Sequence, residues 1–167
     1  AVLVLFLGGY ALAAQRMETV RAEGKTILLA LAPVDPRAPL MGDYMALRYV
    51  VNNDIRKALN AQRNTQKTAG NGKVDASREQ KHNAEGFAVL RITNEPVPQA
   101  AAFMRLYDGS PLQADEFLLA YRLRGYEVTS AAPAFYFQEG TAQQYVGAKF
   151  GVFKLAADGK TLLVGLW

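Results

Sequence analysis

The first fourteen residues, AVLVLFLGGYALAA, carry no charge, and their only strongly polar group is the hydroxyl of Tyr10. A run of this kind requires lipid or a protein core around it. As an α-helix it would rise about 20 Å, whereas the hydrocarbon core of a bilayer is about 30 Å thick. Charged residues follow up to Gly24, which is typical of a helix end. We therefore predict a membrane-anchor helix over residues 1–24, with part of its span missing from this sequence.

Two other interpretations of this run stay open. Ala11-Leu12-Ala13 resembles the small-residue site at which a signal peptide is cleaved, although no basic segment precedes it. The run also fits a helix buried in a protein core. The charged continuation QRMETVRAE favours the anchor, because a helix that leaves a membrane becomes polar on most sides.

The remaining residues, 25–167, are expected to form a single β-rich domain. Half of the chain is hydrophobic, which is enough for one sizeable core, and short apolar runs alternate with Gly, Pro and Asp turns. The predicted fold class is α+β, a mainly antiparallel β domain with two short helices at 52–62 and 141–150. The expected strands are 25–32, 44–51, 86–93, 100–107, 116–128 and 132–140, with a final hairpin over 151–167.

Three hairpins follow from the turn residues. A proline-rich loop would join the strands at 25–32 and 44–51 in a wide hairpin, and Asp108-Gly109 would join 100–107 to 116–128. Asp158-Gly159 would close the last hairpin. Within 116–124, Phe117, Leu119, Tyr121 and Leu123 alternate with Glu116, Leu118, Ala120, Arg122 and Arg124, which predicts a strand with one buried face and an opposite face that is polar toward its end.

The positive charge of the chain is concentrated in one segment. Between Arg56 and Lys81 there are seven Lys or Arg and two Asp or Glu, and few large apolar residues. This composition predicts a helix start followed by a flexible polar insertion over residues 62–85. No aromatic residue in it would stack on bases, so we expect no nucleic-acid partner.

Several chemistries are excluded or disfavoured by composition. The chain has no cysteine, so disulfides and thiolate metal ligands are absent. Its only histidine, His82, lies in the polar insertion, which disfavours a Ser-His-Asp triad or a histidine metal site. We expect neither a metal nor a cofactor.

The stretch GDYMALRY, Gly42 to Tyr49, places unusual polarity on a predicted strand. Strand alternation puts Met45, Leu47, Tyr49 and Val51 on one face, and Tyr44, Ala46, Arg48 and Val50 on the other. We expect the first face to be buried. Gly42 and Asp43 are typical of a turn, in which glycine adopts a positive φ and the aspartate bonds loop amides.

This stretch resembles the signature of the bacterial GDYXXLXY protein family. A second motif, FYFQEG at Phe135 to Gly140 followed by Tyr145, is similar to the family's aromatic-Gln-Glu-Gly stretch. APVDPR, which contains Asp35 and Arg37, is also similar to what members carry. The resemblance covers nearly the whole chain apart from the polar insertion. The motif residues that it marks as possible binding positions are Asp35, Arg37, Gly42, Asp43, Tyr44, Arg48, Tyr49, Phe137, Gln138, Glu139, Gly140 and Tyr145.

The resemblance implies a membrane-anchored bacterial protein of uncharacterised role. Members lie beside genes for multipass membrane proteins, which suggests an integral membrane partner. We favour a non-enzymatic module, anchored in the inner membrane with its domain in the periplasm, that binds such a partner. The alternative is a cell-envelope hydrolase or lyase that uses Asp43 and Glu139 as a carboxylate pair.

A further prediction concerns the contact between the two motifs. Arg48 on a strand face needs a carboxylate or carbonyl partner if it is covered, and Glu139 has no opposite charge near it in the sequence. We therefore expect Arg48 and Glu139 to form an ion pair that joins the two motifs.

Overall fold

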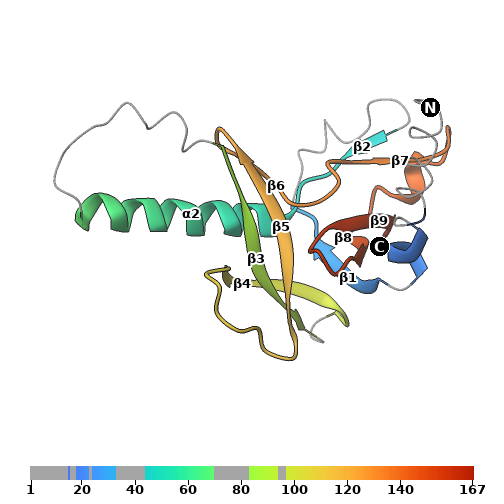
Figure 1. Ribbon diagram of the computed structural model, residues 1–167. Helices are drawn as coiled ribbons and strands as arrows, with labels where there is room; N and C mark the ends of the chain where they lie inside the picture. The colour runs from blue at the N-terminus through green and yellow to red at the C-terminus, as the bar shows by residue number, and fades with distance from the viewer. Residues whose placement is uncertain (1–14, 16–17, 23, 33–43, 70–82, 94–96) are drawn as a thin grey trace, which may run out of the picture.

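The protein is built on a seven-stranded sheet and a separate two-stranded sheet (Figure 1). This computed structural model describes residues 15, 18–22, 24–32, 44–69, 83–93 and 97–167. The order of the large sheet is β6-β5-β3-β4-β1-β8-β9, and β2 and β7 form the small one. The strands are β1 (Lys25–Ala30), β2 (Tyr44–Ala46), β3 (Asn83–Thr93), β4 (Ala100–Leu106), β5 (Glu116–Arg124), β6 (Glu127–Thr129), β7 (Ala134–Tyr136), β8 (Phe150–Leu155) and β9 (Thr161–Leu166).

Strand pairing is antiparallel everywhere except between β1 and β4, which run parallel. Besides the helical residues 18–22, the structure describes the helix α2 (Val50–Ala69) and a short 3₁₀ helix, η2 (Ala142–Gln144). The mainly antiparallel α+β architecture is therefore confirmed. The final hairpin is confirmed as well, because β8 and β9 pair across the turn at Asp158-Gly159.

The core lies where the large sheet meets the first turns of α2 and the buried residues around β2. Strand β5 shows why the alternation matters, since Phe117, Leu119 and Leu123 are buried while their neighbours are more exposed. Helix α2 contributes Val51 and Ile55 to this core. The most completely buried large side chains are Tyr49, Phe153, Ile27, Leu29, Ile55, Leu90, Leu119 and Val89.

The predicted hairpin between 100–107 and 116–128 is wrong, because β3 lies between β4 and β5. Leu90 of β3 pairs with Phe103 of β4 on one side and with Phe117 of β5 on the other. The residues Ala88, Val89 and Leu90 are all fully buried. A strand covered in this way suits a central position, whereas the turn at Asp108-Gly109 fits a longer connection equally well.

The strand predicted over 44–51 is shorter, and the helix after it is longer. Strand β2 ends at Ala46 and α2 begins at Val50, so the wide hairpin is reduced to one bridge between Leu31 and Tyr49. Because α2 continues to Ala69, the first eight residues of the predicted insertion are helical. Ala, Gln, Lys and Arg are good helix formers, and here they extend a helix that has already been nucleated by the packing of its first turns on the core. Residues 70–82 lie outside the described residues.

Helix α2 has a packed half and a projecting half. Figure 1 shows it extending from the sheet toward the left of the view, well beyond the strands that it contacts. Its buried residues, Val51 and Ile55, both lie in the first two turns. The other short helix, predicted over 141–150, is confirmed only as η2.

At the N-terminal side, residues 18–22 are helical, and the amide of Gly24 donates to the carbonyl of Val20 at 2.9 Å. A Cβ on Gly24 would meet that carbonyl oxygen at 2.3 Å, so only glycine fits this helix end. The apolar run at 1–14, on which the predicted anchor depends, lies outside the described residues. Among the residues that the structure describes, no helix is long and apolar enough to cross a bilayer.

Candidate functional site

The two sequence motifs meet in the small sheet. Tyr44 pairs with Tyr136, Met45 with Phe135 and Ala46 with Ala134, in antiparallel register. We call these two strands, β2 and β7, the motif ribbon. Figure 1 shows the ribbon beside the large sheet, at the end of the molecule opposite to the projecting end of α2.

One face of the first motif fastens the ribbon to the core. Met45, Leu47 and Tyr49 are buried, as the alternation predicted, although the regular strand ends at Ala46. The Tyr49 ring meets Phe153 edge-on at 5.5 Å between centroids, and its hydroxyl donates to the carbonyl of Ala132 at 2.7 Å. Burial raises the pKa of the Tyr49 phenol, so the neutral form is favoured. Tyr49 is therefore a structural residue.

The second motif forms an aromatic cluster and a turn. Phe135, Phe137 and Tyr145 pack together, with ring centroids 5.0 Å apart for Phe135 and Tyr145 and 5.6 Å for Phe137 and Tyr145. Gly140 has a φ of 79°, which favours glycine. The amide and the hydroxyl of Thr141 both donate to the carbonyl of Gln138, at 3.1 and 2.6 Å. Gln138 and Glu139 thus belong to a tight turn.

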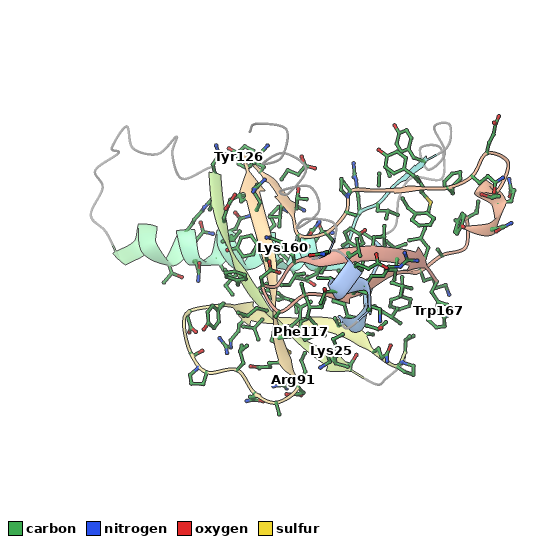
Figure 2. The ribbon with its side chains drawn as sticks, turned by 45° about the vertical axis from the view of Figure 1, so that its right-hand side comes forward. Lys25, Arg91, Phe117, Tyr126, Lys160 and Trp167 are labelled. Carbon is green, nitrogen blue, oxygen red and sulfur yellow. The ribbon has the colours of Figure 1, made fainter. Side chains whose placement is uncertain are left out.

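The other face of the ribbon is open. The rings of Tyr44 and Tyr136 lie 5.7 Å apart, and the two residues are 38% and 76% exposed. Val146 and Trp167 are also exposed large apolar residues. The Trp167 ring is tilted against that of Phe150, with 5.6 Å between the centroids, and Figure 2 shows Trp167 at the same end of the molecule as the ribbon, far from Tyr126 at the β5–β6 turn.

The predicted ion pair between Arg48 and Glu139 is wrong. Among the described residues no ion pair joins them, and both are exposed. The register gives the reason, because Tyr44 lies opposite Tyr136 and the chains run in opposite directions. Arg48 therefore lies beside the residues that precede β7, as the hydrogen bond from the amide of Leu47 to the carbonyl of Pro133 shows. Glu139 comes after the C-terminal end of β7, so the two side chains are at opposite ends of this strand.

Four of the motif positions lie outside the described residues, namely Asp35, Arg37, Gly42 and Asp43. The turn at Gly42-Asp43 and the carboxylate pair of Asp43 with Glu139 stay predictions. Within the described part of the chain, no three His, Cys, Asp or Glu side chains are grouped as metal ligands would be.

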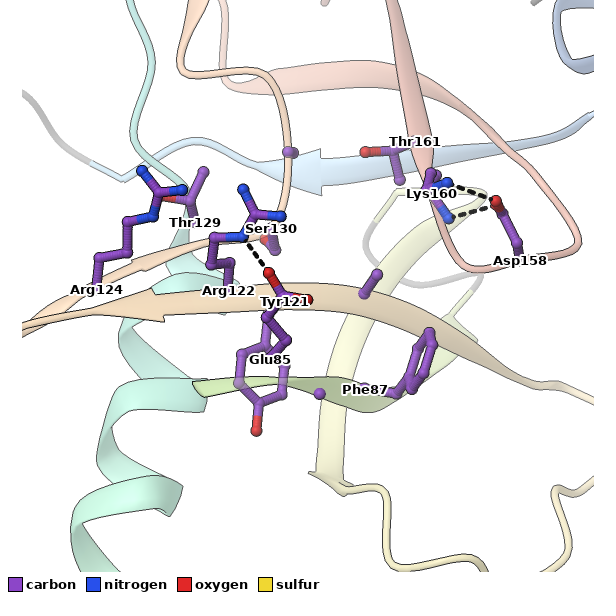
Figure 3. Close-up of a pocket in the computed structure, with 13 residues that line it drawn as sticks. Glu85, Phe87, Tyr121, Arg122, Arg124, Thr129, Ser130, Asp158, Lys160 and Thr161 are labelled. Carbon is purple, nitrogen blue, oxygen red and sulfur yellow. Dashed lines mark hydrogen bonds and ion pairs between the residues drawn. The ribbon is translucent and has the colours of Figure 1, made fainter. Parts of the chain in front are cut away.

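Two neighbouring cavities differ in how their charges are arranged. The first, of about 700 Å³, lies over β3, β5 and the β8–β9 turn (Figure 3). Its arginine Arg122 pairs with Glu85 at 2.6 Å, and its Lys160 ammonium lies 3.1 Å from Asp158. Figure 3 shows both pairs, and it shows that Arg124, which lines this cavity as well as the second one, takes part in neither. The charges of Arg122 and Lys160 are thus satisfied within the protein.

The second cavity, of about 630 Å³, is lined by Arg48, Arg56 and Arg124, and we call it the arginine cavity. Of these three, the sequence singled out only Arg48 as a site residue. Arg56 was one of many charges in a basic segment, and Arg124 is a polar residue at a strand end. The pairing of β6 with β5 places Arg124 in the same cavity wall as the first residues of α2. No pattern in the local sequence predicts that these residues share a cavity.

The comparisons with known proteins agree with the motifs. The family model described as GDYXXLXY protein matches residues 5–166, which is nearly the whole chain. The comparisons with curated proteins and with solved structures give no match. The two motifs, joined in one ribbon, and the extent of this match lead to one conclusion: the chain belongs to the GDYXXLXY protein family.

Proposed function

We propose that this protein is a non-enzymatic binding module that docks an integral membrane protein through the motif ribbon. The observation that carries the proposal is the use of both family motifs in one small, open sheet. The buried face of the ribbon fixes its position, and the outer rings of Tyr44 and Tyr136 remain accessible. Tyrosine is enriched in protein interfaces, because its large ring adds contact area and its hydroxyl keeps a hydrogen bond.

The ribbon also offers backbone groups to a partner. Among the described residues, β2 pairs only with β7, so each strand has an outer edge without a neighbouring strand. An unpaired edge accepts an extended segment of another chain by strand addition, with alternate side chains giving specificity. A loop of a membrane protein, extended along this edge, is the occupant that we propose.

A photo-crosslinking amino acid at Tyr136 tests the proposal directly. We expect irradiation of cells that express the full-length protein to yield a crosslink to one integral membrane protein. Tyr44→Ala in the same chain should lower the crosslink yield, because it removes the ring that lies against Tyr136. The measurement is the band on a gel, with the partner identified by mass spectrometry.

The control places the same crosslinker at Thr65, an exposed position on the projecting half of α2. We expect no crosslink to the same protein from this position. Equal yields from Tyr136 and Thr65, or crosslinks to soluble proteins alone, would contradict docking by the ribbon.

We also propose that the segment before Lys25 ties the module to the inner membrane, with the domain on the periplasmic side. The uncharged run at 1–14 supports this proposal. The full-length protein should sediment with membranes after a carbonate wash, and deletion of the residues before Lys25 should release it. Soluble protein trimmed at Ala13 or Ala14 would instead indicate a cleaved signal peptide.

A further inference from the structure

We propose that the arginine cavity binds a ligand through a doubly charged phosphate group. The proposal concerns a site separate from the outer face of the ribbon, so it holds whether or not the ribbon docks a partner. Three guanidinium groups line one concave site, and a single acid, Glu127, lies among the lining residues. The charged side chains of the cavity therefore leave two positive charges without a counter-charge.

The three arginines come from three different parts of the fold. Arg48 lies between β2 and α2, Arg56 on the second turn of α2 and Arg124 at the end of β5. The packing of the core therefore brings the backbones of three separate elements to one cavity wall, and each of the three exposed arginine side chains extends from that wall. The remaining polar wall comes from Asn52 and Asn53, at the start of α2, and from Thr129 of β6.

The arginines elsewhere in the large sheet behave differently. Arg91 and Arg105 share the carboxylate of Glu116, at 3.2 and 3.5 Å, and Arg122 holds Glu85 at 2.6 Å. Among the described residues, neither Arg48 nor Arg124 has an ion-pair partner.

The third guanidinium of the cavity, that of Arg56, is only partly satisfied. Arg56 donates to the side-chain oxygen of Asn53 at 3.0 Å, and this partner is neutral. Like charges that line one site repel one another, and a bound anion relieves that repulsion. Among the described residues, the arginine cavity thus gathers three cationic groups around a single acid, Glu127.

The chemistry of the lining favours phosphate. A guanidinium presents donors in a planar fork that matches two oxygens of a phosphate or carboxylate group. A phosphate monoester at neutral pH carries close to two negative charges, which balances the excess of the cavity. The first turn of α2 contains no acidic residue, so the partial positive charge of the helix start reinforces this field. The volume of about 630 Å³ accommodates a small ester or a lipid headgroup.

The experiment measures binding of two probes to the purified full-length protein. Calorimetry with glycerol phosphate, a phosphate monoester, tests a soluble source of phosphate, and co-sedimentation with phosphatidylcholine vesicles, with and without phosphatidic acid, tests a lipid source. We expect binding of at least one probe to weaken as salt rises. Arg48→Gln and Arg124→Gln should each weaken it about tenfold, because each removes one charge-assisted contact.

The matched control is Arg122→Gln, which removes the same charge from the same strand as Arg124 but from a residue already paired with Glu85. This variant should bind within about twofold of the unmodified protein, because an exposed ion pair contributes little. Circular dichroism should show the same fold for all three variants, since each replaced side chain is at the surface.

The possible outcomes distinguish a soluble ligand from a lipid headgroup, and they also show when the proposal fails. Arginine-dependent binding of glycerol phosphate supports a soluble ester, and arginine-dependent binding of phosphatidic acid vesicles alone supports a headgroup. Absence of binding to both probes overturns the proposal. Equal loss in Arg122→Gln and Arg124→Gln also overturns it, because general surface charge then explains the binding.

Discussion

The large sheet and the motif ribbon use aromatic residues in opposite ways. In the large sheet, Phe153 and its neighbours are fully enclosed, and their packing holds strands from both ends of the chain together. In the ribbon, two three-residue strands are too small to enclose anything, and the outer rings face solvent. Two-stranded sheets are marginal on their own. The comparison shows that the family motifs form a small sheet that is stable only because its buried residues pack on the core of the large sheet.

Tyr49 is the residue at which these two regions meet. It ends the first motif, packs on Phe153 of the large sheet and bonds to Ala132, just before β7. The comparison therefore predicts a gradient of stability effects, from the core through this junction to the outer face of the ribbon.

The largest effect is expected for Phe153→Ala in the core of the large sheet. Removing this fully buried ring leaves a cavity and takes away the ring against which Tyr49 packs. The free energy of unfolding should therefore fall by about 4 kcal/mol. Chemical denaturation monitored by circular dichroism measures this loss. A fall below about 1 kcal/mol would show that Phe153 does not hold the two regions together.

A smaller loss is expected for Phe135→Ala on the ribbon. This half-buried ring packs on Phe137 and Tyr145, and its removal should cost about 2 kcal/mol. The large sheet should keep its structure, so the near-ultraviolet circular dichroism should change more than the far-ultraviolet signal. A loss as large as that of Phe153→Ala would remove the distinction between the two regions.

The junction is tested by Tyr49→Phe, which keeps the ring and removes the hydrogen bond to Ala132. We expect a loss of about 1 kcal/mol at neutral pH. Because burial raises the pKa of Tyr49 above its usual 10.0, only the unfolded state ionises just above pH 10. The contribution of this group is complete below pH 10 and is lost, by up to about 1.4 kcal/mol per pH unit, as pH rises further.

The pH dependence gives this variant its own control. Denaturation at pH 9 and pH 11 should show a smaller alkaline loss for Tyr49→Phe than for the unmodified protein. Tyr136→Phe, at an exposed tyrosine, should retain the full alkaline loss. Equal alkaline losses in both variants would mean that the Tyr49 phenol ionises without unfolding.

The smallest effect is expected for Tyr136→Ala on the outer face of the ribbon. Its side chain is largely exposed, so the free energy of unfolding should change by less than about 0.5 kcal/mol. Thermal unfolding measures this change, and the crosslinking experiment measures its effect on docking. A loss above about 1 kcal/mol would show that Tyr136 supports the fold and is not simply available to a partner.

Local alternation predicted much of this arrangement. The buried and exposed faces from Tyr44 to Val51 follow from a period of two, and they persist although the regular strand stops at Ala46. The final hairpin, with its turn at Asp158-Gly159, also follows from nearby residues. These features depend on neighbours in the sequence, so the sequence alone is sufficient for them.

Some errors concern the ends of elements, such as the helix predicted over 52–62 that runs from Val50 to Ala69, but the larger ones concern contacts between distant segments. The partner of β5 depends on which apolar strand occupies the centre of the sheet, with a neighbouring strand on each side. The turn residues Asp108 and Gly109 do not determine which strand this is. The failed pairing of Arg48 with Glu139 has the same origin, since the motifs were correctly expected to meet but their register was unknown. Arg124 entered the candidate site only through the three-dimensional arrangement of β5 and β6.

The position of β1 has a consequence for the kinetics of folding. Strand β1 lies between β4, its parallel partner, and β8, with Lys25 paired to Leu155. During synthesis the ribosome therefore releases β1 long before its antiparallel neighbour exists, and contacts of such large sequence separation slow folding. Until β8 and β9 emerge, the edge of β1 stays open to association with other chains. The nascent chain therefore exposes one unpaired edge of β1 until the last hairpin has been synthesised.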